Sequence, residues 1–172
     1  MRYHDLVIYF LTVIKMQTYP MTINGEKLLR AELEYLKSKE RQAVIAAIAE
    51  ARSHGDLSEN AEYDAAKNKQ AFVEGRIAEL EAKLSRCQII DPSKIDSGGR
   101  IIFGAVVTLL DLESDAEISY QIVGDDEADI KKAKISVNSP VAKSLIGKEI
   151  GSVVIVAVPN GTKEYEVLGV SL

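Results

Sequence analysis

The sequence predicts an α+β protein, with an N-terminal antiparallel α-helical coiled-coil hairpin followed by a small antiparallel-sheet domain with one helix. Three observations predict this division. Apolar residues recur at helical spacing between residues 24 and 87. Short apolar runs separated by turn signals then occupy residues 105–170. A Ser-Gly-Gly stretch at residues 97–99 lies between the two patterns, where a linker is expected.

The first long helix is predicted over residues 24–54, with Asn24 as its expected N-cap. Neither Pro nor Gly interrupts the segment from Glu26 to His54. A helix of this length forms a rod of roughly 45 Å, because each residue adds about 1.5 Å. Its apolar positions are Leu29, Leu33, Leu36, Val44, Ala47, Ile48 and Ala51.

Gly55 is expected to end the first helix, and a second helix is predicted from Asp56 or Ser58 to about Cys87. Its heptad rows are Ala66, Val73, Leu80 and Cys87, and Gln70, Ile77 and Leu84. Two helices of similar length joined by a short turn form an antiparallel hairpin. Because each apolar stripe is narrow, the helices should pair mainly with each other and project as a finger.

The sheet domain is predicted over residues 101–172, after a linker over residues 91–100. Two strand pairs are expected, residues 105–112 with 118–123 and residues 153–158 with 164–170. Asn160-Gly161 is a strong turn signal in the second pair. A short helix is predicted over residues 139–146, because Ser139 can cap it and Pro140 suits its first turn.

The N-terminal residues 1–15 do not fit either pattern. Residues 6–14 are apolar, but a membrane span needs about 20 such residues. A secretion signal is disfavoured because no small-residue cleavage site precedes Lys15. We interpret residues 1–15 as an N-terminal extension before a start at Met16 or Met21, with the hairpin over residues 16–90. No membrane partner is expected.

The charge pattern excludes autonomous nucleic-acid binding as the expected function. The net charge is -5, with equal numbers of basic and acidic residues up to residue 90 and an acidic excess beyond it. Binding to a nucleic-acid backbone needs clustered Lys and Arg, so such a role would require a protein partner. The single cysteine, Cys87, excludes a disulfide framework and fits a cytoplasmic location.

The turn between the predicted helices carries the candidate metal ligands. Asp56 and Glu59 are three residues apart and could face one cation together. Two carboxylates make only part of a Mg²⁺ site, so other ligands would have to come from another macromolecule. The alternative is that these acids cap the second helix and complement its dipole, as Glu62 and Asp64 would also do.

Two cations, Arg52 and Lys67, frame this turn. They could form a small patch that faces a phosphate. Alternatively, each could pair with a carboxylate across the hairpin on the solvated surface, where such ion pairs add little to stability. A second acidic stretch, residues 124–129, lacks the spacing of an EF-hand loop. We interpret it as a solvated loop that faces a partner.

Residues 46–63 closely resemble the coiled-coil tip of the bacterial Gre transcript-cleavage factors. The blocks at residues 122–129, 135–140 and 145–148 resemble the same family, and the resemblance extends over residues 16–172. It implies a C-terminal domain similar to FK506-binding proteins that docks on RNA polymerase at the secondary channel. The candidate docking residues are Ser136, Asn138, Ser139 and Pro140.

The resemblance also implies roles for the tip. Asp56 and Glu59 would help to hold a second Mg²⁺ in the polymerase active site, where the polymerase cleaves backtracked RNA. Arg52 and Lys67 would face the 3′ end of that RNA. The chain would then be no enzyme itself, would hold Mg²⁺ only in the complex, and is expected to be a monomer.

Two other functions are alternatives to this one. A prolyl isomerase would fit the implied fold of the C-terminal domain, but Phe103, Tyr120 and Tyr165 offer few aromatic groups and Trp is absent. An inhibitory channel-binding relative would carry an altered tip, whereas this chain has both Asp56 and Glu59.

Overall fold

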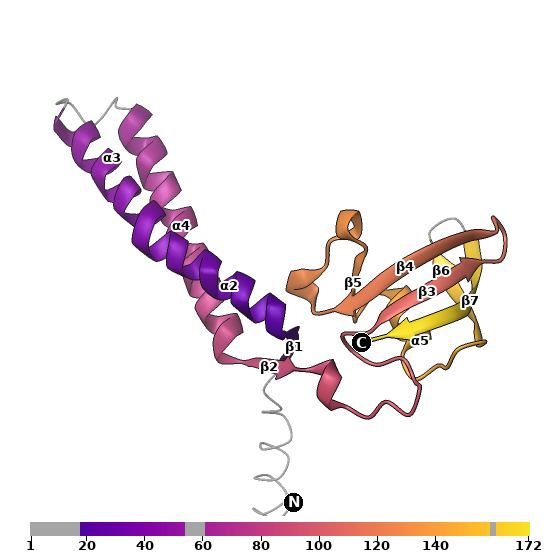
Figure 1. Ribbon diagram of the computed structural model, residues 1–172. Helices are drawn as coiled ribbons and strands as arrows, with labels where there is room; N and C mark the ends of the chain where they lie inside the picture. The colour runs from indigo at the N-terminus through magenta and orange to yellow at the C-terminus, as the bar shows by residue number, and fades with distance from the viewer. Residues whose placement is uncertain (1–17, 54–60, 159–160) are drawn as a thin grey trace, which may run out of the picture.

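The computed structural model describes residues 18–53, 61–158 and 161–172. A long helical hairpin projects from a domain built on a five-stranded sheet (Figure 1). The predicted α+β organisation is therefore confirmed. No helix in the described parts of the chain is long and apolar enough to cross a membrane.

The hairpin begins with a short strand that the sequence did not predict. Strand β1 (Tyr19–Thr22) leads directly into helix α2 (Ile23–Tyr35). Thr22 is extended and caps the helix, because its hydroxyl accepts a hydrogen bond of 3.1 Å from the Gly25 amide. The predicted cap at Asn24 is wrong, since strand pairing holds the chain extended only as far as Thr22 and Asn24 lies inside the first turn.

The rod continues through a π-helical stretch (Leu36–Glu40) into α3 (Arg41–Ser53), and α4 (Ala61–Ser85) returns beside it. The described heptad positions of α4 lie along the seam between the helices. One buried cluster contains Val44, Ile48, Ala66, Val73 and Ile77. A second, at the base, contains Met21, Leu29 and Leu80. Residues 54–60, which contain the predicted turn with Asp56 and Glu59, lie outside the described residues.

A two-stranded parallel sheet closes the base of the hairpin. Strand β2 (Cys87–Ile90) pairs with β1, and Tyr19 lies opposite Cys87. The prediction that Cys87 belongs to the second helix is wrong, because α4 ends at Ser85. Cys87 still packs against the basal cluster, as its heptad position predicts.

The C-terminal sheet has the strand order β5-β4-β3-β7-β6. Both predicted hairpins are present, as β3 (Val106–Asp111) with β4 (Ala116–Val123), and β6 (Val153–Val158) with β7 (Gly161–Ser171). Strand β5 (Lys134–Ser136) was not predicted and pairs parallel to β4. The sheet is therefore antiparallel except at this edge.

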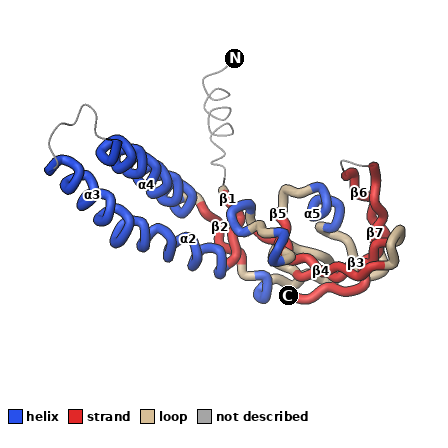
Figure 2. Tube along the Cα trace, turned by 90° about the horizontal axis from the view of Figure 1, so that it is seen from above, coloured by secondary structure: helices blue, strands red, loops and turns tan. Residues whose placement is uncertain are grey.

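Helix α5 (Pro140–Leu145) packs on one side of the sheet (Figure 2). Ser139 caps it by accepting a hydrogen bond of 3.2 Å from the Ala142 amide, as predicted. Gly147 follows in a left-handed conformation with φ of 82°, which favours glycine. The core below the helix is fully enclosed and includes Ile101, Val107, Leu109, Ile122, Ala142, Leu145 and Val167.

Candidate functional site at the end of the hairpin

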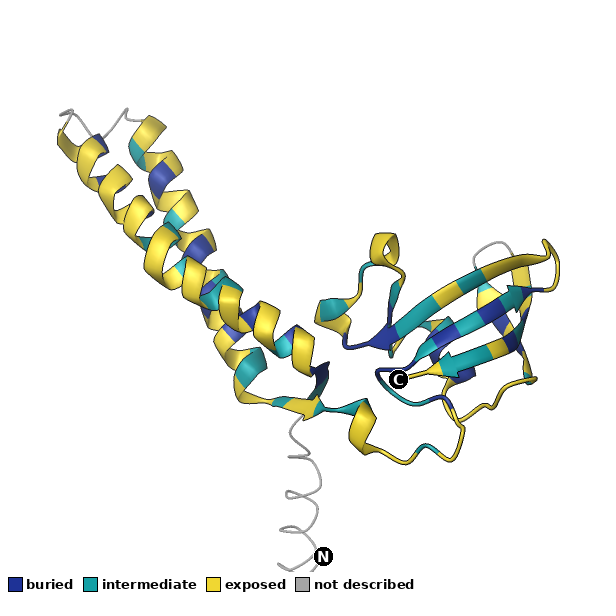
Figure 3. Cartoon of the chain, in the orientation of Figure 1, coloured by how far each residue is buried: buried dark blue, intermediate teal, exposed yellow. Residues whose placement is uncertain are grey.

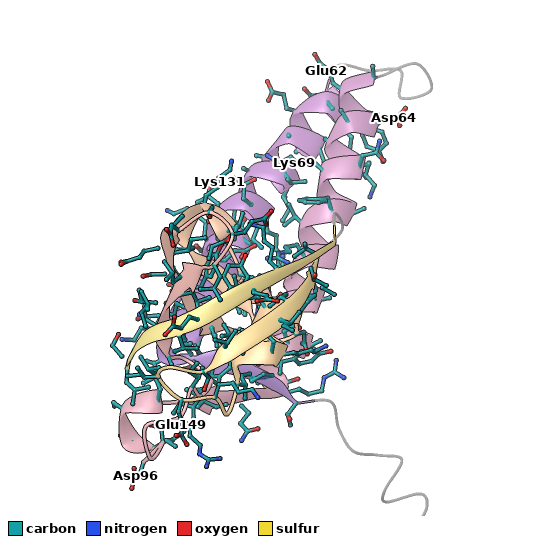
Figure 4. All side chains as sticks on the ribbon, turned by 90° about the vertical axis from the view of Figure 1, so that its right-hand side faces the viewer. Glu62, Asp64, Lys69, Asp96, Lys131 and Glu149 are labelled. Atoms are coloured by element: carbon teal, nitrogen blue, oxygen red, sulfur yellow. The ribbon has the colours of Figure 1, made fainter. Side chains whose placement is uncertain are left out.

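The end of the hairpin carries the residues that the sequence selects, and the structure describes its two flanks. Arg52 lies in the last turn of α3, and Lys67 lies in the second turn of α4. Asp56 and Glu59 belong to the turn outside the described residues, so their pairing remains a prediction. Glu62 and Asp64 are exposed in the first turn of α4, next to that turn (Figure 4).

Arg52 and Lys67 line the same surface cavity, which has a volume of about 270 Å³. Its other walls are Ile45, Ile48, Ala49 and Gln70. The Arg52 guanidinium lies 5.8 Å from the centroid of the Tyr63 ring, a cation–π distance. Lys67 Nζ donates a hydrogen bond of 2.9 Å to Gln70 Oε1. Both helices thus bring a cation to one partly apolar hollow.

Further down the rod, cations are paired with carboxylates across the hairpin. Arg41 donates hydrogen bonds of 2.7 and 2.6 Å to the two carboxylate oxygens of Glu74. These bonds hold the pKa of Glu74 below its usual range. Lys69 pairs with Glu40 at 3.0 Å. Of the ion pairs that the described residues form, none includes Arg52 or Lys67, whereas Arg41 and Lys69 are both paired.

Carboxylates in the first turn of α4 complement the helix dipole, which is the structural role considered for this acidic stretch. The described parts of the chain contain no group of three or more His, Cys, Asp or Glu side chains that could hold a metal ion. Oxygen donors of the Asp56 and Glu59 kind are the type that Mg²⁺ prefers.

The four candidate docking residues lie together where β5 leads into α5. Asn138 and Pro140 are exposed, whereas the side chains of Ser136 and Ser139 are engaged within the domain. The Ser136 hydroxyl bonds to the Asp125 carboxylate, and Asn138 Nδ2 donates a hydrogen bond of 2.9 Å to Asp125 Oδ2. Two of the four residues thus hold the acidic loop over residues 124–129.

The acidic loop is exposed at Asp125, Asp126 and Ala128, as expected for a solvated loop, but it also contacts the hairpin. Glu127 Oε1 accepts a hydrogen bond of 2.8 Å from the Thr22 amide, and Asp126 pairs with Lys83 at 2.5 Å. Both partners belong to the base of the hairpin. Sequence patterns did not reveal this contact because Thr22 and Glu127 are 105 residues apart.

A prolyl-isomerase site gains no support from the described residues. The cavity between α5 and β6 has a volume of about 510 Å³, and the residues that line it include no aromatic group. They are Lys143, Ser144, Lys148, Val153, Val154 and Ile155. Tyr165 is buried in the core and does not face this cavity.

The described chain thus combines a helical finger with a sheet domain and carries two cations, Arg52 and Lys67, beside the end of the finger. Two family models match the chain, one described as "Transcription elongation factor, N-terminal" over residues 19–89 and one as "Transcription elongation factor, GreA/GreB, C-term" over residues 96–172. The chain belongs to the GreA/GreB family of transcription elongation factors. The resemblance to the Gre family seen in the sequence is confirmed.

Known relatives agree with this assignment. The chain is 60% identical to transcription elongation factor GreA of Thioalkalivibrio sulfidiphilus over 155 residues, covering 90% of this chain and 98% of the relative. It is 57% identical to GreA of Ralstonia nicotianae with the same coverage. Among solved structures, GreA factor homolog 1 (Gfh1) of Thermus thermophilus is 30% identical, covering 91% of this chain and 100% of that chain, with a TM-score of 0.42.

Proposed function

We propose that this chain binds RNA polymerase and stimulates the polymerase to cleave backtracked nascent RNA, which rescues arrested complexes. The observation that carries the proposal is the match of both parts of the chain to the GreA/GreB family. In this function the chain supplies positioned side chains, and the polymerase performs the chemistry. The protein itself would therefore not be an enzyme.

The shape of the molecule supports a division between docking and reaching. The hairpin extends away from the sheet domain, so its end is distant from the corner where β5 leads into α5 (Figure 1). We assign polymerase docking to that corner, because Asn138 and Pro140 are exposed there. The hairpin would then enter the secondary channel and bring its tip to the active centre.

At the tip, Asp56 and Glu59 would each contribute carboxylate oxygens to a Mg²⁺ whose other ligands belong to the polymerase and the RNA. When bound, this second ion would neutralise charge and supply an activated water. Arg52 and Lys67 would bind a phosphate of the backtracked RNA at their shared cavity. No ion pair among the described residues includes Arg52 or Lys67, which favours this role.

The decisive experiment uses a stalled, backtracked elongation complex with labelled RNA. The Asp56→Asn, Glu59→Gln double variant should lose most of its cleavage stimulation and keep its binding to polymerase. Asn caps a helix about as well as Asp, so Asp56→Asn tests charge and not the cap. Raising Mg²⁺ should partly rescue each single variant, because one ligand would remain.

Glu62→Gln is the matched control, since Glu62 is exposed beside the turn but lies outside the proposed ligand pair. It should retain nearly full stimulation. If Glu62→Gln were as damaging as Asp56→Asn, the tip would act as a diffuse acidic surface. Full cleavage stimulation by the double variant would refute the metal-binding mechanism.

The basic cavity can be tested separately from the acids. Arg52→Gln and Lys67→Gln should each weaken stimulation, because each removes one positive charge from the cavity wall. Lys69→Gln removes the same charge two residues further along α4, where Lys69 pairs with Glu40. The Lys69→Gln variant should stimulate cleavage at a rate close to that of the wild type. Equal losses at Lys67 and Lys69 would show that only the overall charge of the hairpin matters.

A further inference from the structure

Glu127, in the sheet domain, contacts the first residues of helix α2 in the hairpin. Its Oε1 accepts the Thr22 backbone amide at 2.8 Å, and its Oε2 accepts the Thr22 hydroxyl. Thr22 is the N-cap of α2, and its exposed fraction is only 9%. One carboxylate of the second domain is therefore bonded to both donors of the residue that caps α2.

This arrangement reproduces a capping box with one partner taken from another domain. In an ordinary capping box, a Glu at the third helical position accepts the amide of the N-cap residue. Gly25 occupies that position here, so α2 has no side chain of its own for the task. A Cβ built on Gly25 would lie 2.1 Å from Glu127 Cδ. The Glu127 carboxyl thus fills the space that a capping side chain of α2 would need.

Neighbouring contacts fix the loop that carries Glu127 to both parts of the molecule. Lys83 of α4 pairs with Asp126 at 2.5 Å and with Glu79 at 2.6 Å. A Cβ built on Gly124 would lie 2.3 Å from the Pro20 carbonyl oxygen, so the loop backbone packs directly on β1. On the other side, Asp125 is bonded to Ser136 and Asn138 of the sheet domain. The base of the hairpin and the domain meet at this junction (Figure 2).

We propose that Glu127 is a positioning residue that completes the cap of α2 from the second domain and so fixes the angle at which the hairpin leaves the sheet. A rod of roughly 45 Å is a long lever: a rotation of about 10° at its base moves its end by about 8 Å. The part of this inference that concerns cleavage rests on the proposed function, because only there must the tip reach a defined point.

A merely structural role, in which Glu127 only stabilises the start of α2, makes a different prediction from a positioning role. The Glu127→Ala, Gly25→Glu double variant separates the two. The introduced glutamate would lie at the third helical position and could accept the Thr22 amide within its own helix. The space left by the Glu127 side chain would admit it. The cap would then be restored while the bond between the domains stays broken.

The orientation of the hairpin is measured by electron–electron double resonance between spin labels on Asn68→Cys in α4 and Glu117→Cys in β4. Both positions are exposed, and Cys87→Ser removes the native thiol. Thermal denaturation and cleavage of a backtracked complex are measured on the same variants. Glu113→Ala, an exposed glutamate in the turn between β3 and β4, is the matched control.

We expect Glu127→Ala to lower the melting temperature, to broaden the distance distribution by several ångströms and to reduce cleavage stimulation. Adding Gly25→Glu should recover the melting temperature but neither the narrow distribution nor the cleavage. Glu127→Gln keeps one oxygen acceptor for the Thr22 amide and should keep the distribution narrow. Glu113→Ala should match the wild type in all three measurements.

An unchanged distance distribution in Glu127→Ala would overturn the proposal, as would a double variant that recovers the narrow distribution along with the melting temperature. A broadened distribution with full cleavage would overturn the link between hairpin angle and activity. Failure of the wild-type chain to stimulate any cleavage would instead refute the proposed function. The distance measurements would still decide the role of Glu127.

Discussion

The hairpin and the sheet domain bury their apolar residues in different ways. In the hairpin, a thin line of buried residues runs between helices whose other faces are exposed (Figure 3). In the sheet domain, β strands and α5 enclose a compact core in which Leu109 and Ile122 are fully buried. Because the two helices bury only this narrow seam, charged residues such as Glu62 and Asp64 can lie exposed at the end of the hairpin. The enclosed domain supplies the fixed base.

The two regions also differ in where their charged side chains lie and how deeply these are buried. The hairpin joins its helices with partly exposed pairs such as Arg41–Glu74 and Lys69–Glu40. The sheet domain buries one carboxylate, Asp111, with an exposed fraction of 1%. Asp111 accepts hydrogen bonds from Lys163 at 2.6 Å and from the Glu113 and Ser114 amides. The rod thus carries its ion pairs along its surface, whereas the domain buries one member of its Lys163–Asp111 pair.

The largest difference between the regions should appear in truncations of buried side chains. Leu109→Ala should cost about 4 kcal/mol of unfolding free energy and Ile77→Ala about 2 kcal/mol, because the cost depends on how well the site can collapse. Two helices can move together around a lost side chain, whereas the enclosed sheet core cannot. Urea denaturation followed by circular dichroism measures both. Equal losses would contradict the comparison.

The second-largest effect should be a pH-dependent loss of stability when Asp111 is replaced. The hydrogen bond from Lys163 holds the pKa of Asp111 below its ordinary value. Ionised Asp111 therefore stabilises the fold above the unfolded-state pKa of about 3.9, and this contribution is lost as the pH falls through the lower folded-state pKa. Asp111→Asn should lower the melting temperature at neutral pH, and the difference from wild type should shrink in acid.

Asp115→Asn is the control for that experiment. Asp115 is exposed in the same turn with φ of 55°, a conformation that Asn tolerates. Its melting temperature should follow that of the wild type at every pH. A difference between Asp111→Asn and wild type that stayed constant into strong acid would show that side-chain shape, and not charge, makes the contribution.

The smallest effect should come from the ion pairs of the hairpin. Arg76 bonds to Glu32 across the hairpin at 2.7 Å and to Glu79 along α4 at 2.9 Å. Arg76→Gln should lower the melting temperature less than Ile77→Ala, because a half-buried ion pair stabilises less than a buried apolar side chain. The loss should diminish in about 1 M salt, which screens charges beyond about 3 Å. Lys39→Gln, an exposed change on the same rod, should have no measurable effect. A salt-independent loss at Arg76 would indicate packing of its aliphatic chain.

Local patterns predicted those features that depend on neighbouring residues. The seam of the hairpin follows from the spacing of Ala66, Val73, Ile77 and Leu80, because residues at that spacing share one face of a helix. The α5 helix follows from Ser139-Pro140, which combines a side-chain acceptor with a residue suited to the first turn. Arg52 and Lys67 could be selected because they flank the turn on either side.

Only the tertiary structure decided how distant segments meet. Strand β1 contains only four residues and includes Pro20, so it carries no recognisable strand pattern, yet pairing with β2 forms it. The parallel pairing of β5 with β4 likewise needs a partner that periodicity cannot identify. Gly25 and Glu127 each look ordinary in the sequence. Their complementarity depends on an approach between residues about a hundred positions apart, which the packing of the two regions alone determines.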